Sequence, residues 1–248
     1  MENALLVGLS RQVALANELD VVANNVANIE TNGFKRRATI FQEYLSPKAR
    51  AESFRERDRP VSFVWDKGTA LQFTQGAIDR TGNPLDVAIR SDALFVVRGA
   101  AGERYTRNGS FDLNARGELV NSDGLTVQSD QGPLVFGRSD TDIRIAADGT
   151  VTSSQGVKGK LRLVRADNPQ LLRNEGRNTF STATPLGPAR PQDIRLEQGA
   201  LERSNVRPVL EISRMIELNR SYQNVAMLMQ KTDELRRTAI NRLADQQS

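Results

Sequence analysis

The sequence predicts an α+β fold in which discontinuous N- and C-terminal helices form a coiled-coil module flanking a mainly antiparallel β-domain. Glycine is concentrated in the interior: of 18 glycines, only Gly8 precedes residue 33 and none follows Gly199. Proline is distributed in the same way, since only Pro208 of the 9 prolines lies in the flanks. Both flanks carry apolar residues at helical spacing, whereas the interior alternates short apolar runs with turn-forming residues.

Residues 1–30 are predicted to form the N-terminal helix of this module. Apolar and small residues recur at alternating steps of four and three, as in the seam of a coiled-coil helix: Leu5, Leu9, Gln12, Ala16, Leu19, Ala23 and Val26. Because Gln12 and two alanines make the seam thin, the helix should need partners on several sides. The turn formers Thr31, Asn32 and Gly33 predict that it ends near Asn28.

Three asparagines within five residues, Asn24, Asn25 and Asn28, are unusual inside a helix, because asparagine competes for its own backbone hydrogen bonds. Asn24 and Asn28 are four residues apart and share a helix face, so their amides could bond to neighbouring helices and fix the register. A helix end that frays before a turn explains the same residues equally well. Both interpretations stay open at this point.

Residues 31–69 show neither helical nor strand periodicity and are predicted to be an extended or irregular connector, ending in the apolar run Val61–Trp65. Residues 70–204 are predicted to be a β-rich domain. Its expected strands are Leu94–Val97, Leu134–Phe136, Ile143–Ala146 and Leu161–Val164, with tight turns at Asn114–Gly117, Ser122–Gly124 and Asp148–Gly149. Residues Tyr105–Phe111 could form a hairpin with a glycine turn, and Arg107 within it is expected to be a surface cation.

Residues 205–248 are predicted to form a C-terminal helix that pairs with the N-terminal one. Pro208 opens it, at a position where a first helical turn tolerates proline, and the pattern continues to about residue 243. The apolar stripe consists of Met215, Leu218, Tyr222, Val225 and Met229, flanked by Ile212, Ile216 and Leu228. This is the stronger of the two helical patterns.

The formal net charge of +4 would ordinarily suggest a nucleic acid as partner. The basic excess is largest in residues 31–59, where Lys35, Arg36, Arg37 and five further cations are interspersed with four acidic residues. This pattern is typical of a solvated mixed-charge segment rather than a phosphate-binding stripe. We therefore expect no nucleic-acid partner, and binding of DNA or of an anionic surface is kept as an alternative.

The composition argues against catalysis. The chain has no cysteine and no histidine, which excludes thiol nucleophiles, imidazole proton shuttles and Cys or His metal sites. Because most interior carboxylates stand beside glycine or in predicted turns, we expect no enzyme, no metal and no cofactor. An enzyme acting on an envelope polymer and a dimeric coiled-coil adaptor remain alternatives. The apolar stretch Ala4–Leu9 is too short for a signal peptide or a membrane span, so neither a cleaved signal nor membrane insertion is expected.

Four stretches, in this order, resemble the axial proteins of the bacterial flagellum, the rod and hook family. The first is Leu19–Asn28, continuing through Thr31–Arg36. The central two are Gly82–Ile89 and Tyr105–Phe111, the latter followed by Gly117–Val120. The last is Leu201–Val206, followed by Met215-Ile216 and Arg220-Ser221-Tyr222. Each stretch is modest alone, but four in this order are highly specific, and they cover nearly the whole chain.

The resemblance implies a structural subunit of the basal-body rod, with paired terminal helices as an inner layer and the β-domain as an outer layer. Copies and other rod proteins would stack into a hollow helical shaft that transmits torque across the periplasm. The family resemblance favours a proximal-rod position, with a distal-rod or hook-type protein, or an envelope polysaccharide-binding protein, as alternatives. Subunits of this family leave the cell unfolded through the flagellar type III export apparatus, a route that suits a chain without thiols.

The expected assembly interface combines the two seams with the signature residues. Apolar side chains would be buried against neighbouring protomers, and asparagine amides, including that of Asn205, would set the register. The expected interface consists of Leu5, Leu9, Gln12, Ala16, Leu19, Ala23, Asn24, Asn25, Val26, Asn28, Gly33, Ser204, Asn205, Val206, Ile212, Met215, Leu218, Tyr222, Val225 and Met229.

Overall fold

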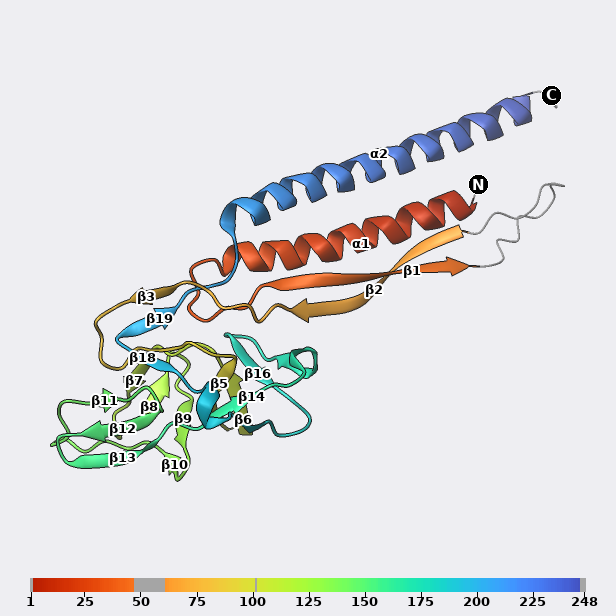
Figure 1. Cartoon of the computed structure of the whole chain (residues 1–248). Helices are drawn as coiled ribbons and strands as arrows, with labels where there is room; N and C mark the ends of the chain where they lie inside the picture. The colour runs from red at the N-terminus through yellow and green to blue at the C-terminus, as the bar shows by residue number, and fades with distance from the viewer. Residues whose placement is uncertain (1, 47–60, 101, 246–248) are drawn as a thin grey trace. The chain divides into compact units, whose positions relative to one another are not determined.

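The computed structural model describes residues 2–46, 61–100 and 102–245 (Figure 1). It divides the chain into two units. The helical unit comprises Met1–Val26, Arg37–Ala70 and Arg207–Ser248, and the β unit comprises Ala27–Arg36 and Leu71–Val206. Each unit is therefore built from segments that are far apart in the sequence. Two helices, one at each end of the chain, flank a mainly antiparallel β region, as the sequence predicts.

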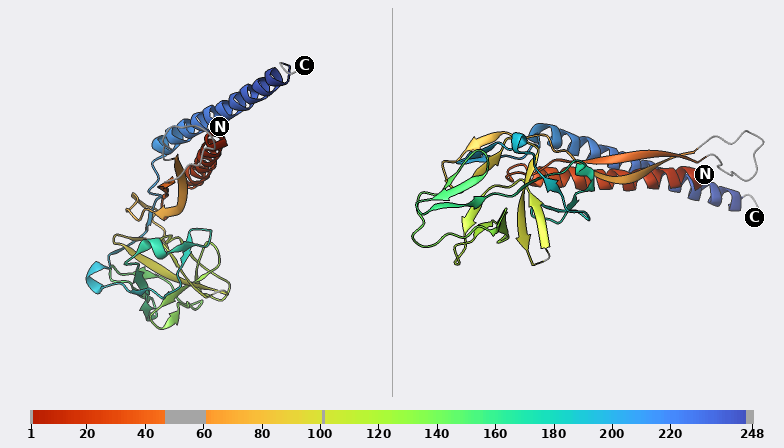
Figure 2. Two further views of the ribbon diagram at one scale, coloured as in Figure 1. Left: turned by 90° about the vertical axis from the view of Figure 1, so that its right-hand side faces the viewer. Right: turned by 60° about the horizontal axis from the view of Figure 1, so that its bottom comes forward.

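The helical unit contains α1 (Glu2–Ala27) and α2 (Pro208–Asp245), which lie side by side in each view (Figures 1 and 2). Their contacts fix the direction of the pair. Asn25 bonds to Glu211, Glu18 bonds to Arg214, and the backbone at Gly8 lies against Met229. Residue numbers rise along one helix as they fall along the other, so the pair is antiparallel. Its coiled-coil geometry stays a prediction.

An apolar cluster fills the space between the two helices. Leu15, Val22 and Leu218 are buried at its centre, and five partly buried side chains pack around them: Leu19, Val26, Met215, Tyr222 and Val225. On each helix these residues recur at steps of three and four, which places them on one face. Burial of this face, rather than intrinsic propensity, is what stabilises α1 at its length of 26 residues.

Two strands, β1 (Arg37–Ser46) and β2 (Val61–Leu71), pair as a two-stranded sheet in the segment for which the sequence predicts an extended or irregular connector. Thr39, Ile40 and Phe41 favour strand conformation by side-chain type, but they stand consecutively and give no alternation that periodicity can detect. The middle of the predicted connector, residues 47–60, lies outside the described residues.

The β unit is organised around one large antiparallel sheet with strand order β15-β16-β6-β5-β9-β8-β7, in which β10 joins β9 and β14 joins β5 and β17. The strands of this sheet are β5 (Ala93–Gly99), β6 (Gly102–Thr106), β7 (Phe111–Leu113), β8 (Leu119–Asn121), β9 (Thr126–Ser129), β10 (Gly132–Pro133), β14 (Leu163–Arg165), β15 (Arg173–Asn174), β16 (Thr179–Ser181) and β17 (Gly187–Pro188).

Three smaller antiparallel sheets complete the unit. One has the order β11-β12-β13, and two are pairs, β18-β4 and β19-β3. The elements are β3 (Ile78–Arg80), β4 (Val87–Ile89), β11 (Arg144–Ile145), β12 (Thr150–Ser153), β13 (Gly156–Lys160), β18 (Leu196–Gln198) and β19 (Ala200–Glu202), with short 3₁₀ helices at Pro169–Leu171 and Pro191–Asp193. The two pairs join the first strands of the unit to its last, so the sheet structure closes only when both ends are in place.

Strand β5 separates two apolar cores. Ala93, Phe95 and Val97 point into the larger cluster, while Leu94 and Val96 point into the smaller one. Side chains alternate between the faces of a strand, so a strand covered on both faces must be apolar at every position. This explains the continuous run that predicts a strand at Leu94–Val97.

The other predicted strands are realised less fully. The expected strand Ile143–Ala146 contains the two-residue β11, and Leu161–Val164 overlaps β14. Leu134–Phe136 forms no regular strand. Its backbone is satisfied through bonds from Leu119 N–H to Leu134 O and from Phe136 N–H to Gly117 O, with a single bridge at Val135. Apolar runs locate the buried segments here, but they do not determine how many ladder bonds each segment makes.

Two of the predicted tight turns contain glycines that need left-handed backbone. Gly117 has φ of +75° and Gly124 has φ of +76°, each closing a turn by an N–H bond, to Asn114 O and Asn121 O respectively. Their surroundings differ. A Cβ atom at Gly117 would stand 2.0 Å from the carbonyl oxygen of Phe136, whereas one at Gly124 would meet nothing within 4 Å.

We expect Gly117→Ala to lower the free energy of unfolding by at least about 3 kcal/mol, because backbone strain and a steric clash act together. Gly124→Ala is the matched control, with the same strain and no clash, and should cost about 1–2 kcal/mol. Urea unfolding of both full-length variants, followed by circular dichroism, measures the difference. Equal losses for the two variants would show that the contact at Phe136 does not constrain this turn.

Candidate assembly interface

The structure brings together six residues of the predicted interface between α1 and α2. Leu19 and Val26 from α1 pack with Met215, Leu218, Tyr222 and Val225 from α2. Met229 lies farther along the same pair, against Gly8, where an added Cβ would stand 3.3 Å from the Met229 Cγ. Within the subunit, these positions serve the contact between its own two helices.

Other residues of the predicted seam point away from that contact. Leu9 is 50% exposed, Ile212 is 46% exposed and Ala23 is exposed, whereas Gln12 and Ala16 are half-buried. Leu5 lies within α1, and its side chain is outside the described part of the structure. The seam read from the sequence is therefore turned partly toward solvent, because the contact with α2 is centred on Leu15, Leu19, Val22 and Val26.

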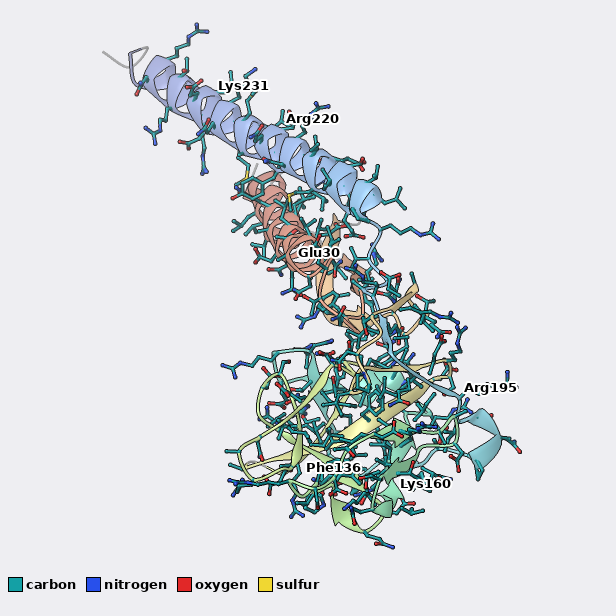
Figure 3. The ribbon with its side chains drawn as sticks, turned by 90° about the vertical axis from the view of Figure 1, so that its left-hand side faces the viewer. Glu30, Phe136, Lys160, Arg195, Arg220 and Lys231 are labelled. Atoms are coloured by element: carbon teal, nitrogen blue, oxygen red, sulfur yellow. The ribbon has the colours of Figure 1, made fainter. Side chains whose placement is uncertain are left out.

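Each helix carries a second row of apolar side chains on its outer side. The α1 stripe consists of Leu6, Leu9 and Val13, and the α2 stripe consists of Val209, Ile212 and Ile216. These six side chains are 46–75% exposed. At about 100° per residue, each stripe lies more than 120° around its helix from the face that contacts the other helix. The polar residues Arg220 and Lys231 of α2, labelled in Figure 3, are also exposed.

Asn25 is fully buried and makes its hydrogen bonds within the subunit. Its Nδ2 donates to Arg37 O at 2.8 Å and to Glu211 Oε2 at 3.1 Å, and its Oδ1 accepts from Arg37 N–H at 2.9 Å. The side chain thus joins α1, β1 and α2. The sequence pattern predicts that Asn25 sets the register between protomers, but these hydrogen bonds hold together elements of a single helical unit.

Asn24 and Asn28 occupy different surroundings. Asn28 follows the last residue of α1, and its backbone and side-chain oxygens accept bonds from the N–H and hydroxyl groups of Thr31 at 3.3 and 3.1 Å. It therefore shapes the turn after the helix, as the helix-end interpretation expects. Asn24 is half-buried within α1. A role for either residue between protomers stays a prediction.

The ion pair between Glu18 and Arg214 also joins the helices. The sequence pattern does not predict this pair. Arg214 Nε and Nη2 donate to Glu18 Oε1 at 3.0 and 2.5 Å. These hydrogen bonds are the main cause that raises the pKa of Arg214 above its ordinary value. Nothing local in the sequence pairs position 18 with position 214.

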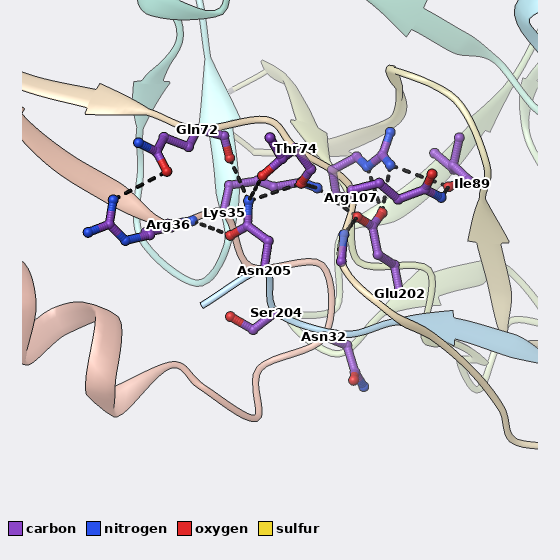
Figure 4. A network of polar contacts seen from close by, with 12 residues as sticks. Asn32, Lys35, Arg36, Gln72, Thr74, Ile89, Arg107, Glu202, Ser204 and Asn205 are labelled. Atoms are coloured by element: carbon purple, nitrogen blue, oxygen red, sulfur yellow. Dashed lines mark hydrogen bonds and ion pairs between the residues drawn. The ribbon is translucent and has the colours of Figure 1, made fainter. Parts of the chain in front are cut away.

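In the β unit, a buried group of charges joins three segments of the chain, and Figure 4 shows it from close by. This carboxylate cluster consists of Glu202 with Lys35 and Arg107. The Lys35 Nζ atom lies 2.6 Å from Glu202 Oε1, and Arg107 Nη2 lies 2.6 Å from Glu202 Oε2. All three side chains are at most 2% exposed. The backbone N–H of Gly76 also donates to Glu202 Oε1, at 2.9 Å.

Backbone carbonyls accept the remaining donors of the two cations. Lys35 Nζ donates to Thr74 O at 2.9 Å, and Arg107 donates to the carbonyl oxygens of Ser91, Ala93 and Ile89. Burial is the largest cause that lowers the pKa of Lys35, and the nearby Arg107 charge lowers it further, while Glu202 acts in the opposite direction. Such a cluster is tolerated in a protein interior only because its charges are hydrogen-bonded throughout.

This geometry corrects two sequence-based interpretations. Arg107, expected at the surface, is 3% exposed and ion-paired. Lys35, assigned to a solvated mixed-charge segment, is 1% exposed and is the largest fully buried side chain among the described residues. Both cations are internal because a carboxylate more than 90 residues away meets them. Lys35 is consequently unavailable to the phosphates of a nucleic acid, the alternative partner considered for this segment.

The remaining signature residues surround this cluster. Gly33 has φ of +68°, and a Cβ atom there would stand 2.5 Å from the carbonyl carbon of Arg107, so only glycine fits. Asn205 accepts from Arg36 N–H at 2.7 Å and donates to the carbonyl oxygens of Gln72 and Thr74. Ser204 and Val206 are buried beside it. Like Asn25, Asn205 makes these hydrogen bonds within the subunit.

A hollow of about 370 Å³ in the β unit is a candidate ligand site, and two of the cations that line it, Arg90 and Arg165, are ion-paired. Arg90 contacts Glu197 at 2.5 Å, and Arg165 contacts Asp193 at 3.3 Å. Over the described ranges, no three acidic side chains gather as metal ligands would. Neither helix, as far as it is described, has the length and apolar character needed to cross a membrane.

Three protein families match successive parts of the chain. Residues 5–35 match the flagella basal body rod protein family, residues 88–153 match the D1 domain of the flagellar hook proteins FlgE, FlgF and FlgG, and residues 197–243 match the C-terminal region of the flagellar basal body rod FlgEFG proteins. Together they include Lys35, Arg107 and Glu202, the three members of the carboxylate cluster.

Full-length relatives agree with these matches. The chain is 40% identical to the flagellar basal-body rod protein FlgF of Caulobacter vibrioides over 98% of both chains. It is 34% identical to FlgF of Mesorhizobium japonicum over 94% of both chains. With the rod protein FlgG of Buchnera aphidicola (subspecies Baizongia pistaciae), it shares 30% identity over 88% of this chain and 90% of the relative.

We expect Glu202→Gln to lower the free energy of unfolding of the β unit by about 3 kcal/mol or more, because two buried cations lose their counter-charge. Glu197→Gln is the matched control, since it removes a carboxylate whose partners Arg80 and Arg90 are largely exposed, and it should have a much smaller effect. Hydrogen exchange at the β5 amides reports the stability of this unit. Similar protection in both variants would contradict a stabilising role for the cluster.

Proposed function

The chain belongs to the family of flagellar basal-body rod and hook proteins FlgE, FlgF and FlgG, and from this we infer that it is a structural subunit of the basal-body rod and not an enzyme. The observation that carries the inference is 40% identity to a rod protein over 98% of both chains. Matches at the N-terminal, central and C-terminal regions support a complete set of family segments rather than one shared domain.

Within the rod, we propose the proximal position of FlgF. Relatives named FlgF share 40%, 34% and 32% identity with the chain, whereas two named FlgG share 30% and 32%. A distal-rod position like that of FlgG is the second candidate, favoured by these nearly equal values. Binding of an envelope polysaccharide, a further alternative from the sequence, gains no support from the hollow beside Arg90 and Arg165, whose cations are paired within the subunit.

The proposed mechanism is mechanical. The α1 and α2 stripes expose apolar side chains on the outer sides of a helix pair whose inner faces are already buried, so each subunit can pack against others on two sides. Burying a half-exposed leucine or isoleucine contributes about 1 kcal/mol, and many such contacts add up along a filament. Copies of the chain and other rod proteins would stack in this way into a hollow helical shaft that carries torque across the periplasm.

Stiffness inside each subunit would come from buried polar groups. Asn25 connects α1, β1 and α2 in the helical unit, and the carboxylate cluster connects three segments of the β unit. We propose that the chain reaches the rod through the flagellar type III export apparatus, without a cleaved signal peptide. The absence of cysteine supports this route, because an unfolded chain entering an oxidising compartment then has no thiols to mispair.

A gene deletion tests the proposed function directly. In a flagellated bacterium that carries this chain, loss of its gene should stop rod growth, so that isolated basal bodies lack hook and filament. Wild-type complementation should restore both, and mass spectrometry of the basal bodies should find the chain with its first residues intact. Normal flagella in the deletion strain, with no paralogue in the rod, would contradict the assignment.

A substitution on the α2 stripe tests the mechanism. Ile216 is 50% exposed, so Ile216→Glu should leave the subunit folded while it reduces the amount of chain in basal bodies at least tenfold, because a charge would be buried between subunits. Asn224→Asp places a negative charge at an exposed position of the same helix, about 80° around the helix from Ile216 and outside the stripe. Immunoblots of basal bodies measure incorporation, and equal incorporation of the two variants would refute a buried α2 stripe.

A further inference from the structure

Three arginines line the hollow of about 370 Å³ in the β unit: Arg90, Arg165 and Arg195. Two of them are held by carboxylates of the subunit, since Arg90 pairs with Glu197 and Arg165 pairs with Asp193. Arg195 is exposed at the surface of the unit (Figure 3). Among the described residues, its guanidinium has no ion-pair partner. This arginine hollow therefore contains one cation whose charge is not matched within the subunit.

The loop between β4 and β5 contributes to the arginine hollow, and Arg107 holds its backbone in place. Three carbonyl oxygens of this segment accept hydrogen bonds from the Arg107 guanidinium, as Figure 4 shows for the first of them: Ile89, Ser91 and Ala93. The N–H of Arg90 donates to Arg195 O at 2.7 Å. The backbone beside these two arginines is thus fixed without a ligand, and a preorganised site loses less free energy on binding.

A hydroxyl group at the arginine hollow lacks a hydrogen-bond partner. Ser91 Oγ is buried, and none of the described residues bonds to it. An unpaired hydroxyl in the interior is unfavourable. Because Ser91 lines the hollow, rotation about its Cα–Cβ bond lets the hydroxyl donate to an acceptor placed there. The unpaired hydroxyl and the unmatched cation both favour a ligand with negatively charged oxygen atoms.

The other lining residues favour a singly charged and small ligand. Guanidinium groups bind carboxylates and phosphates equally well by geometry. The exposed Asp92 also lines the hollow, and it repels a doubly charged phosphate more strongly than a carboxylate. No aromatic ring occurs among the described lining residues, so a nucleobase has nothing to stack on. The volume is near the lower end of the roughly 300–1,000 Å³ of small-molecule sites, which suits one side chain with its neighbouring peptide groups.

We propose that the arginine hollow binds the carboxylate of an acidic side chain in a peptide segment of another protein. Arg195 pairs with this carboxylate, and the Ser91 hydroxyl donates to one of its oxygens. The amide of Gln192, which is exposed and lines the same hollow, bonds the adjoining peptide backbone. Arg90 and Arg165 keep N–H donors beyond those in their ion pairs, because a guanidinium carries five. The site lies in the β unit and does not depend on the proposed role in the rod.

A peptide titration tests the proposal on the purified full-length chain. The probe is acetyl-Gly-Glu-Gly-amide, the uncharged control is acetyl-Gly-Gln-Gly-amide, and NMR follows the backbone amides of Ser91 and Arg195. We expect the Glu peptide to shift both signals saturably and to bind about tenfold more tightly than the Gln peptide, because the Gln peptide cannot accept a charge-assisted hydrogen bond. Equal affinity of the two peptides, or saturable shifts that leave both signals unmoved, would overturn the proposal.

Two salts test the chemical class of the ligand. Sodium acetate supplies a carboxylate without a peptide, and sodium phosphate supplies an anion of higher charge. At matched ionic strength, both should bind more weakly than the Glu peptide. Acetate binding as tight as that of the peptide would overturn the part of the proposal that concerns a peptide segment, and tighter phosphate binding would overturn the preference for a carboxylate.

Three variants locate the site. Arg195→Gln should weaken binding of the Glu peptide about tenfold, whereas Arg173→Gln, at an exposed arginine that does not line the hollow, should leave it unchanged. Asp92→Asn should strengthen binding, because it removes the opposing charge. Circular dichroism checks that each variant is folded. Equal effects of the two arginine substitutions, or weaker binding by the Asp92 variant, would contradict the site. These assays use purified chain, so their failure leaves the proposed role in the rod standing.

Discussion

The β unit depends on one buried carboxylate, that of Glu202. Lys35, Arg107 and the N–H of Gly76 all donate hydrogen bonds to it. A single acidic group therefore binds two cations that lie 167 and 95 residues before it in the sequence. Backbone carbonyls accept the other donors of the two cations, so all three charges of this cluster are hydrogen-bonded. Gly33 can approach the Arg107 backbone only because it has no side chain. The signature segments at both ends of the chain are thus parts of one polar structure.

In the helical unit, each helix carries apolar side chains on two sides. One side of α2 contacts α1 through Leu218 and its neighbours, and the other side carries Val209, Ile212 and Ile216. A helix in a self-sufficient domain would have a polar outer side. Here each helix exposes a short apolar stripe away from its partner, which supports the proposed packing against other subunits.

Much of the fold could be predicted from local pattern. The distribution of glycine and proline and the three-four spacing of apolar residues identify both helices, and Pro208 is the first residue of α2. The strands β1 and β2 were missed because their β-favouring residues are consecutive. The carboxylate cluster was missed because nothing near Lys35 or Arg107 in the sequence indicates Glu202. Asn25 and Asn205 were recognised as important, but their partners proved to lie within the chain. Pairings over long sequence separations are set by the topology, and local periodicity does not report topology.

The pairing of first strands with last strands has a consequence for the order in which the molecule can fold. Strand β3 pairs with β19, strand β4 pairs with β18, and both Lys35 and Arg107 form ion pairs with Glu202. A polypeptide threaded from its first residue through a narrow passage cannot complete any of these pairings until about four-fifths of it has emerged. The β unit can therefore close only after β18, β19 and the Glu202 carboxylate have emerged.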